Sequence, residues 1–72
     1  MTHNDRRMTR VMGQMEAAAR HAAAARDAEA QSADAPAGSA GQAGLLMAAQ
    51  CFRQLSAFNV TNAGRLTAGK GR

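Results

Sequence analysis

The chain has no tryptophan, tyrosine or isoleucine, one proline and one cysteine. A single cysteine, Cys51, excludes an internal disulfide and a zinc site built on several cysteines. No stretch approaches the ~20 apolar residues of a membrane span, and no secretory apolar segment follows the early arginines. We therefore expect no signal peptide and no transmembrane segment. Localisation stays open between the cytoplasm and incorporation into an assembly such as a virion.

Large apolar side chains are also scarce. Alanine supplies 19 of the residues behind the 46% apolar content, against five Met, four Leu, two Phe and two Val. A chain of 72 residues buries only a modest fraction of its surface on folding. A buried alanine methyl contributes far less than the roughly 1.5–3 kcal/mol of a buried Leu or Phe. We expect no independent globular core, and therefore completion by other chains.

The first half of the sequence predicts one long helix over residues 5–31, because it is rich in alanine and lacks proline. With Met8 at heptad position a, the a and d positions form an apolar stripe that the charged residues avoid. The stripe consists of Met8, Val11, Met15, Ala18, Ala22 and Ala25. We expect this helix to pack through the stripe, with an isolated, solvated helix as the alternative. His21 lies outside the stripe and is expected to be solvated.

Residues 32–44, SADAPAGSAGQAG, are predicted to be a flexible linker, because Pro36 ends the helical pattern and three glycines follow it. Residues 45–63 are predicted to form a second helix that ends at Gly64. Residues 64–72 are predicted to be a disordered basic tail. The fold class is therefore all-α, with two helices on either side of the linker within one small subunit.

The second helix has a broad apolar face that a thin alanine-rich helix cannot cover. We predict that another protein or another copy covers it. Cys51 on this face is expected to be a buried, inert thiol, and Arg53 is expected on a solvated opposite face. The predicted interface consists of Leu45, Ala48, Phe52, Leu55, Phe58, Met8, Val11 and Met15.

The charges are divided unevenly along the chain. All five acids lie in residues 1–34, where five arginines balance them, and the net charge of +4 therefore lies in residues 35–72. Arg65, Lys70 and Arg72 in the predicted tail are candidate contacts for an anion. Sequence-nonspecific nucleic-acid binding is therefore an alternative function, although no aromatic residues accompany these charges for base stacking.

Residues with catalytic or metal-binding potential are scattered. His3 and His21 lie far apart, the acids form no paired or metal-ligand spacing, and no phosphate-binding loop is present. We predict no catalytic, cofactor or metal site, and binding to a membrane surface is not expected. The predicted function is a non-enzymatic structural or interaction subunit of a multi-copy assembly, for example of the virion or secretion type.

The stretch LLMAAQCFRQLSAFNVTNAGR resembles the C-terminal half of type III secretion needle subunits, which are small helical hairpins with a Leu-Ser-aromatic-Asn stretch followed by Asn-Ala. The matching residues are Leu55, Ser56, Phe58, Asn59, Asn62 and Ala63. The likeness covers under a third of the chain, with different spacing between the motifs. The proline-flanked turn and apolar C-terminus of that family are missing. By analogy it implies a hairpin that assembles. Small virion subunits of tailed phages are similar in composition only.

Overall fold

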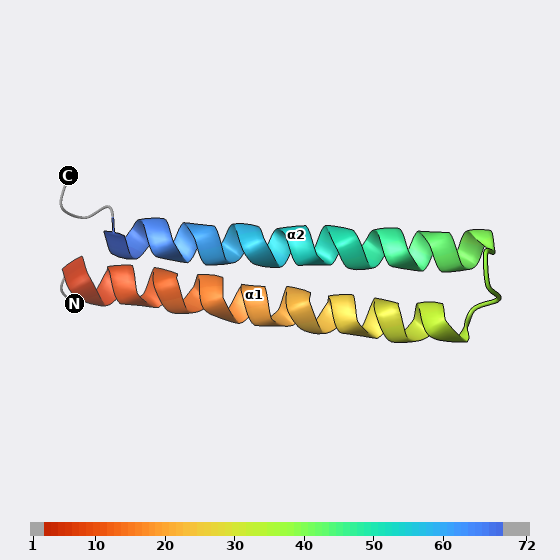
Figure 1. Ribbon diagram of the computed structural model, residues 1–72. Helices are drawn as coiled ribbons and strands as arrows, with labels where there is room; N and C mark the ends of the chain where they lie inside the picture. The colour runs from red at the N-terminus through yellow and green to blue at the C-terminus, as the bar shows by residue number, and fades with distance from the viewer. Residues whose placement is uncertain (1–2, 69–72) are drawn as a thin grey trace.

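The computed structural model describes residues 3–68 as two long helices that lie side by side in opposite directions (Figure 1). Helix α1 spans His3–Asp34 and helix α2 spans Ala40–Ala68. The hairpin measures 53 × 21 × 11 Å. The start of α1 and the end of α2 meet at one end, called the open end, and the turn lies at the other (Figure 1). The predicted all-α class with two helices is confirmed.

The connection between the helices is much shorter than the linker predicted over residues 32–44. Residues 32–34 belong to α1 and residues 40–44 belong to α2, so only residues 35–39 lie outside the helices. Ser39 caps α2, because its hydroxyl oxygen accepts a hydrogen bond of 3.1 Å from the backbone N–H of Gln42. Serine followed three residues later by glutamine is the spacing of a capping box. The prediction missed this signal.

Gln42 ties the two helix ends together. Its side-chain oxygen accepts a bond of 2.8 Å from the Gly38 N–H, and its amide nitrogen donates to the carbonyl of Ser32 at 3.2 Å. Gly38 has a φ of +74°, a left-handed conformation that glycine adopts without strain. Pro36 disfavours a helical conformation at the residue before it, which accounts for the end of α1. The result is a compact turn.

Both helices extend further than predicted. α1 begins at His3 and continues to Asp34, beyond the predicted 5–31. Gly64 does not end α2, which continues to Ala68, so residues 64–68 of the predicted tail are helical. A single glycine in a helix costs only about 1 kcal/mol relative to alanine, which the surrounding helix can offset. Lys70 and Arg72 lie outside the described residues.

The Ser39 cap gives a direct test of the turn. Ser39→Ala removes the acceptor for the first free N–H groups of α2 and should lower the free energy of unfolding by about 0.5–2 kcal/mol. Ser39→Asn keeps a capping oxygen and should retain most of the stability. Thermal unfolding followed by far-UV circular dichroism measures both variants. An equal loss of unfolding free energy in the two variants would contradict a capping role for Ser39.

Candidate protein-interaction surface

The two helices meet along what we call the seam, two facing rows in which steps of three and four residues alternate. The row on α1 consists of Arg7, Val11, Gln14, Ala18, His21, Ala25, Ala28 and Ser32. The row on α2 consists of Gln42, Leu45, Ala49, Phe52, Ser56, Asn59, Ala63 and Leu66. This is the heptad spacing of coiled coils. Most of the side chains are small or polar, and all are at least half-buried.

Two of the six residues of the apolar stripe predicted on α1 lie outside the contact between the helices. Val11, Ala18 and Ala25 lie in the seam, and Ala22 is half-buried beside it. Met8 and Met15 are exposed instead. Arg7, Gln14 and His21 occupy the seam positions next to them in sequence. The side of α1 that packs on α2 is therefore turned by about 50° from the centre of the predicted stripe, half of the 100° between successive residues.

A chain of polar groups crosses the seam and explains this rotation. The Asn59 side-chain oxygen lies 2.8 Å from Nδ1 of His21, and its amide nitrogen donates to the side-chain oxygen of Gln14 at 2.8 Å. The imidazole also stacks on the Phe52 ring, with the centroids 6.4 Å apart. The expectation of a solvated His21 is thus wrong. Polar groups inside a contact need such partners, because an unpaired one costs about 1–3 kcal/mol.

Alanines fill the remaining layers of the seam. Ala18, Ala25, Ala28, Ala49 and Ala63 are the buried apolar residues of the described chain. Their small side chains leave room for a close approach of the helices. The Ser56 hydroxyl, for example, donates across the seam to the backbone carbonyl of Ala18 at 2.9 Å. The helices are therefore held together by small side chains and by hydrogen bonds across the seam.

An ion pair spans one edge of the seam. Arg53 donates to the two carboxylate oxygens of Glu29 at 2.9 and 2.6 Å, in the paired geometry favoured by guanidinium and carboxylate groups. This hydrogen bonding lowers the pKa of Glu29 below its usual 4.5 and raises the pKa of Arg53. Both side chains remain about half exposed. Arg53 is exposed, as expected, but its pairing with Glu29 across the seam was not predicted.

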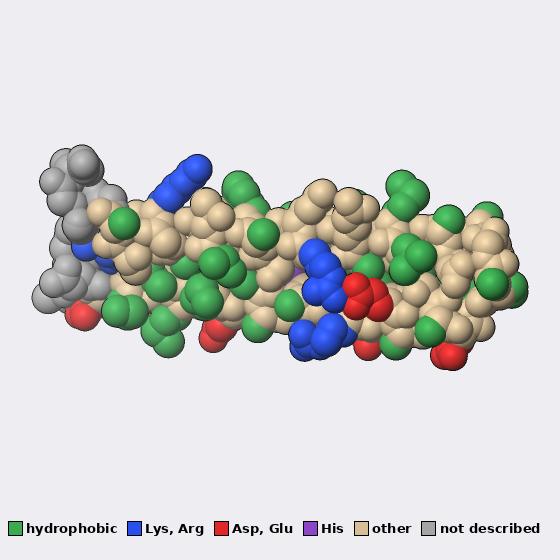
Figure 2. Space-filling view, in the orientation of Figure 1, with side chains coloured by type: hydrophobic (Ala, Val, Ile, Leu, Met, Phe, Trp, Pro, Cys, Tyr) green, Lys and Arg blue, Asp and Glu red, His purple; other side chains and the backbone are tan. Residues whose placement is uncertain are grey.

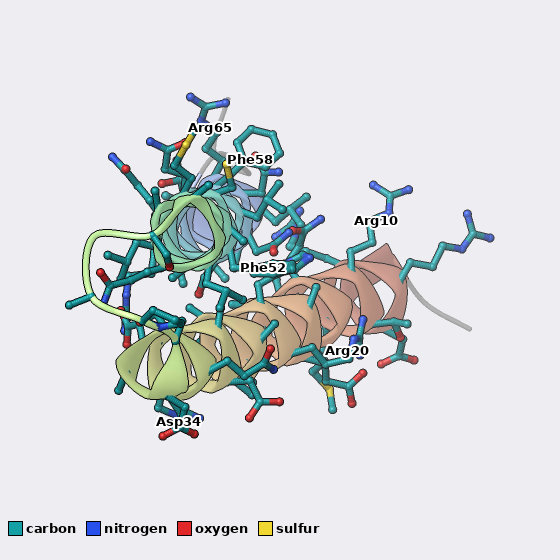
Figure 3. All side chains as sticks on the ribbon, turned by 90° about the vertical axis from the view of Figure 1, so that its right-hand side faces the viewer. Arg10, Arg20, Asp34, Phe52, Phe58 and Arg65 are labelled. Carbon is teal, nitrogen blue, oxygen red and sulfur yellow. The ribbon has the colours of Figure 1, made fainter. Side chains whose placement is uncertain are left out.

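The bulky apolar side chains mostly lie outside the seam. Among the described residues, those exposed are Met8, Met12, Met15, Leu46, Met47, Leu55, Phe58 and Val60. Cys51 is also exposed, so the prediction of a buried thiol is wrong. Phe52 lies between the helices, whereas Phe58 points away from α1 (Figure 3) and is 58% exposed.

The eight residues predicted as a partner interface therefore fall into two groups. Val11, Leu45 and Phe52 are half-buried in the seam, and Ala48 is half-buried beside it. The other four remain open to a partner, namely Met8, Met15, Leu55 and Phe58. The prediction could not separate the groups, because it did not establish which side of each helix faces the other. It also missed Met12, Leu46, Met47 and Val60.

The exposed methionines of α1 share one side of that helix. Met8, Met12 and Met15 follow steps of four and three residues, and Val60 is exposed on α2 opposite this part of α1. We call these four residues the methionine face. Figure 2 shows a group of larger apolar side chains toward the open end and further apolar side chains spread over the rest of this face. A continuous apolar area on a small hairpin is typical of a protein contact.

Arginines from both helices converge at the open end. Arg10 and Arg65 line one shallow groove together with Gln14 and Asn62, and Arg6, Arg7 and Arg10 line another beside Leu66. Arg65 is thus a possible anion contact in the company of α1 arginines, which the sequence prediction did not include. Lys70 and Arg72, the other predicted contacts, lie outside the described residues.

Comparison of the chain with protein-family models, curated proteins and solved structures finds no match. Within residues 3–68, neither helix is long and apolar enough to cross a membrane. The same residues contain no group of three His, Cys, Asp or Glu side chains that could hold a metal ion.

The polar chain in the seam can be tested through Asn59. Asn59→Ala leaves His21 and Gln14 without this partner and should reduce the free energy of unfolding by about 1–3 kcal/mol. Gln54→Ala, at an exposed position of the same helix, should change it by less than about 0.5 kcal/mol. Chemical denaturation measures both. A similar loss of unfolding free energy in the two variants would show that the polar chain does not stabilise the hairpin.

The ion pair predicts a pH dependence of stability. Glu29 has a lowered pKa in the hairpin, so its contribution is present above its unfolded value of about 4.5 and is lost as pH falls through the lowered pKa. Glu29→Gln should therefore reduce the loss of Tm between about pH 6 and about pH 3. Glu16→Gln is the control, because Glu16 is exposed and forms no ion pair within residues 3–68. Identical pH profiles for wild type and Glu29→Gln would contradict the prediction.

Proposed function

We propose that this protein is a non-enzymatic structural subunit that is completed by association with further copies of itself. The proposal is based on where the large apolar side chains lie, which is mostly on the surface of the hairpin. Alanine and polar groups fill the seam, while eight bulky apolar residues face outward. Burying one such side chain fully is worth roughly 1.5–3 kcal/mol, so an association that covers several of them would add substantially to a marginal hairpin.

The methionine face is the proposed contact. Methionine adapts its shape to a partner surface, because its side chain is unbranched and has three rotatable bonds. Met8, Met12 and Met15 lie on successive turns of α1, and Val60 broadens the area toward α2. Met8 and Val11 line one shallow groove together with Arg7 and Thr67, so this area reaches the edge of the seam.

A second copy is the proposed partner, because one contact between two identical apolar faces would cover both faces at once. Arginines gather at the open end. The acids nearer the turn, Asp27, Glu29 and Asp34, are balanced by Arg20, Arg26 and Arg53 in the same half of the hairpin.

The proposal predicts that a charge on the methionine face prevents association. Met12→Asp places a carboxylate on an exposed position, so the hairpin should keep its helical content while the dissociation constant rises at least about tenfold, which corresponds to 1.4 kcal/mol. Gln54→Asp adds the same charge at another exposed position of the hairpin and should associate like wild type. Light scattering coupled to size-exclusion chromatography gives the mass. A wild-type chain that stays monomeric at all concentrations would refute the proposal.

Nucleic-acid binding is the second candidate, and the convergence of Arg6, Arg7, Arg10 and Arg65 at the open end favours it. Binding of this kind depends on phosphate contacts and weakens steeply with salt. Titration of a labelled oligonucleotide at several salt concentrations tests it. Arg10→Gln together with Arg65→Gln should weaken binding and reduce the salt dependence. Unchanged binding in this double variant would exclude the open end as the site.

A further inference from the structure

A second face of the hairpin lies on the other side of the seam from the methionine face. It is formed near the open end by residues that immediately precede seam residues, whereas those of the methionine face immediately follow them. Its members are Arg6 and Arg10 on α1, and Phe58, Asn62 and Arg65 on α2. Arg10, Phe58 and Arg65 project toward the same side of the hairpin (Figure 3). We call these five residues the basic face.

The basic face borders the grooves between the helices at the open end. Arg10 and Arg65 line one groove from opposite helices, together with Asn62. Arg6, Arg7 and Arg10 line the groove beside it. No acid lines either groove, and within residues 3–68 none of these arginines forms an ion pair. Their guanidinium groups are therefore available to an anionic ligand.

The acids of the same half lie elsewhere. Asp5 and Glu16 are each two residues from a seam residue, a step that turns about 200° around the helix and places them on the side of α1 away from α2. Figure 2 shows most acidic groups along this outer edge of α1, and α2 contains no acid. Helix stability does not account for the arginines of α1, because the N-terminal end of a helix is already positive. The charge of the basic face is complementary to an anion.

Phe58 adds an aromatic ring beside these charges. It lies one helical turn before Asn62 and two turns before Arg65, and it is exposed. An exposed aromatic ring next to a basic groove is how many proteins hold single-stranded nucleic acid, because every unpaired base offers a flat face for stacking. The sequence did not reveal this pairing of ring and charge, because it predicted that α2 ends before Arg65.

We propose that the basic face binds single-stranded nucleic acid, with phosphates on the arginines of the open end and an unpaired base stacked on Phe58. The amide of Asn62 lies between the ring and Arg65 on α2 and offers a hydrogen bond to the strand. This binding mode rests on the second proposed function, nucleic-acid binding, and specifies the form of the nucleic acid. It leaves the methionine face free for self-association.

Two other anionic partners fit the basic face less well. A duplex can contact the arginines, but its bases are paired and stacked on one another, so Phe58 gains nothing from it. An anionic membrane would take up the ring of Phe58, but the neighbouring amide of Asn62 would then lie against hydrocarbon without a hydrogen-bond partner. A single strand satisfies the charge, the ring and the amide together.

Binding of a labelled oligothymidine, followed by fluorescence anisotropy at low salt, tests the site. Phe58→Leu keeps an exposed apolar side chain but removes the ring, and should raise the dissociation constant at least about fivefold. Val60→Leu, at an exposed position of the methionine face, should leave it unchanged. Arg65→Gln should reduce the slope of log K against log salt by about 0.7, one phosphate contact. Arg26→Gln, at an exposed position nearer the turn, should not change this slope.

Tryptophan fluorescence reports stacking directly, because the chain has no tryptophan of its own. Phe58→Trp should bind the oligothymidine at least as tightly as wild type, and its emission should be quenched on binding because indole stacks on bases as well. Val60→Trp places the same fluorophore on the methionine face and should keep its emission. A duplex of the same length should leave the emission of both variants unchanged.

The outcomes separate stacking from nucleic-acid binding in general. Weaker binding by Phe58→Leu, together with quenching in Phe58→Trp by the single strand alone, supports the proposal. Binding that Arg10→Gln with Arg65→Gln weakens but Phe58→Leu leaves unchanged overturns the stacking and retains nucleic-acid binding. A wild-type chain that binds no oligonucleotide at low salt refutes both. Binding to phosphatidylglycerol vesicles but not to oligonucleotides overturns the proposal in favour of a membrane surface.

Discussion

The close contact between two alanine-lined helix faces is the interaction on which the hairpin depends. Alanine at Ala18, Ala25 and Ala49 leaves room for side chains to reach across to the opposite helix, as the bond from the Ser56 hydroxyl to a backbone carbonyl shows. This proximity brings the amide of Asn59 within reach of groups on α1. The narrow seam also has a cost, because alanine burial contributes little hydrophobic free energy. The hydrogen bonds across the seam give the contact a defined register.

The close approach of the two helices also determines which side chains lie on the surface. Large side chains do not fit between closely packed helices except in a few layers, such as the one where Phe52 stacks on His21. The remaining bulk, including Met12 and Phe58, faces outward. Residues 3–68 form only the two helices, which leaves this bulk uncovered within the described part of the chain. The structure of a single copy therefore presents apolar area that an association would bury.

The sequence was sufficient to predict two helices, since alanine content and the single proline determine them locally. It was not sufficient to predict the seam. Apolar pattern alone favoured Met8 and Met15 as contact residues, whereas His21 and Gln14 take such positions because Asn59, distant in sequence, supplies their hydrogen bonds. The turn was mispredicted for a different reason. The glycines of residues 32–44 suggested flexibility, although serine and glutamine at capping-box spacing were present.

Completion by association is the central claim, and the concentration dependence of thermal unfolding tests it most directly. If association stabilises the folded hairpin, Tm must rise with protein concentration, because binding shifts the unfolding equilibrium by mass action. Circular dichroism melts over a hundredfold range of concentration, at constant salt and pH, provide the measurement. Tm should increase steadily across this range. A cooperative transition with a constant Tm, in a chain that sediments as a monomer throughout, would contradict it.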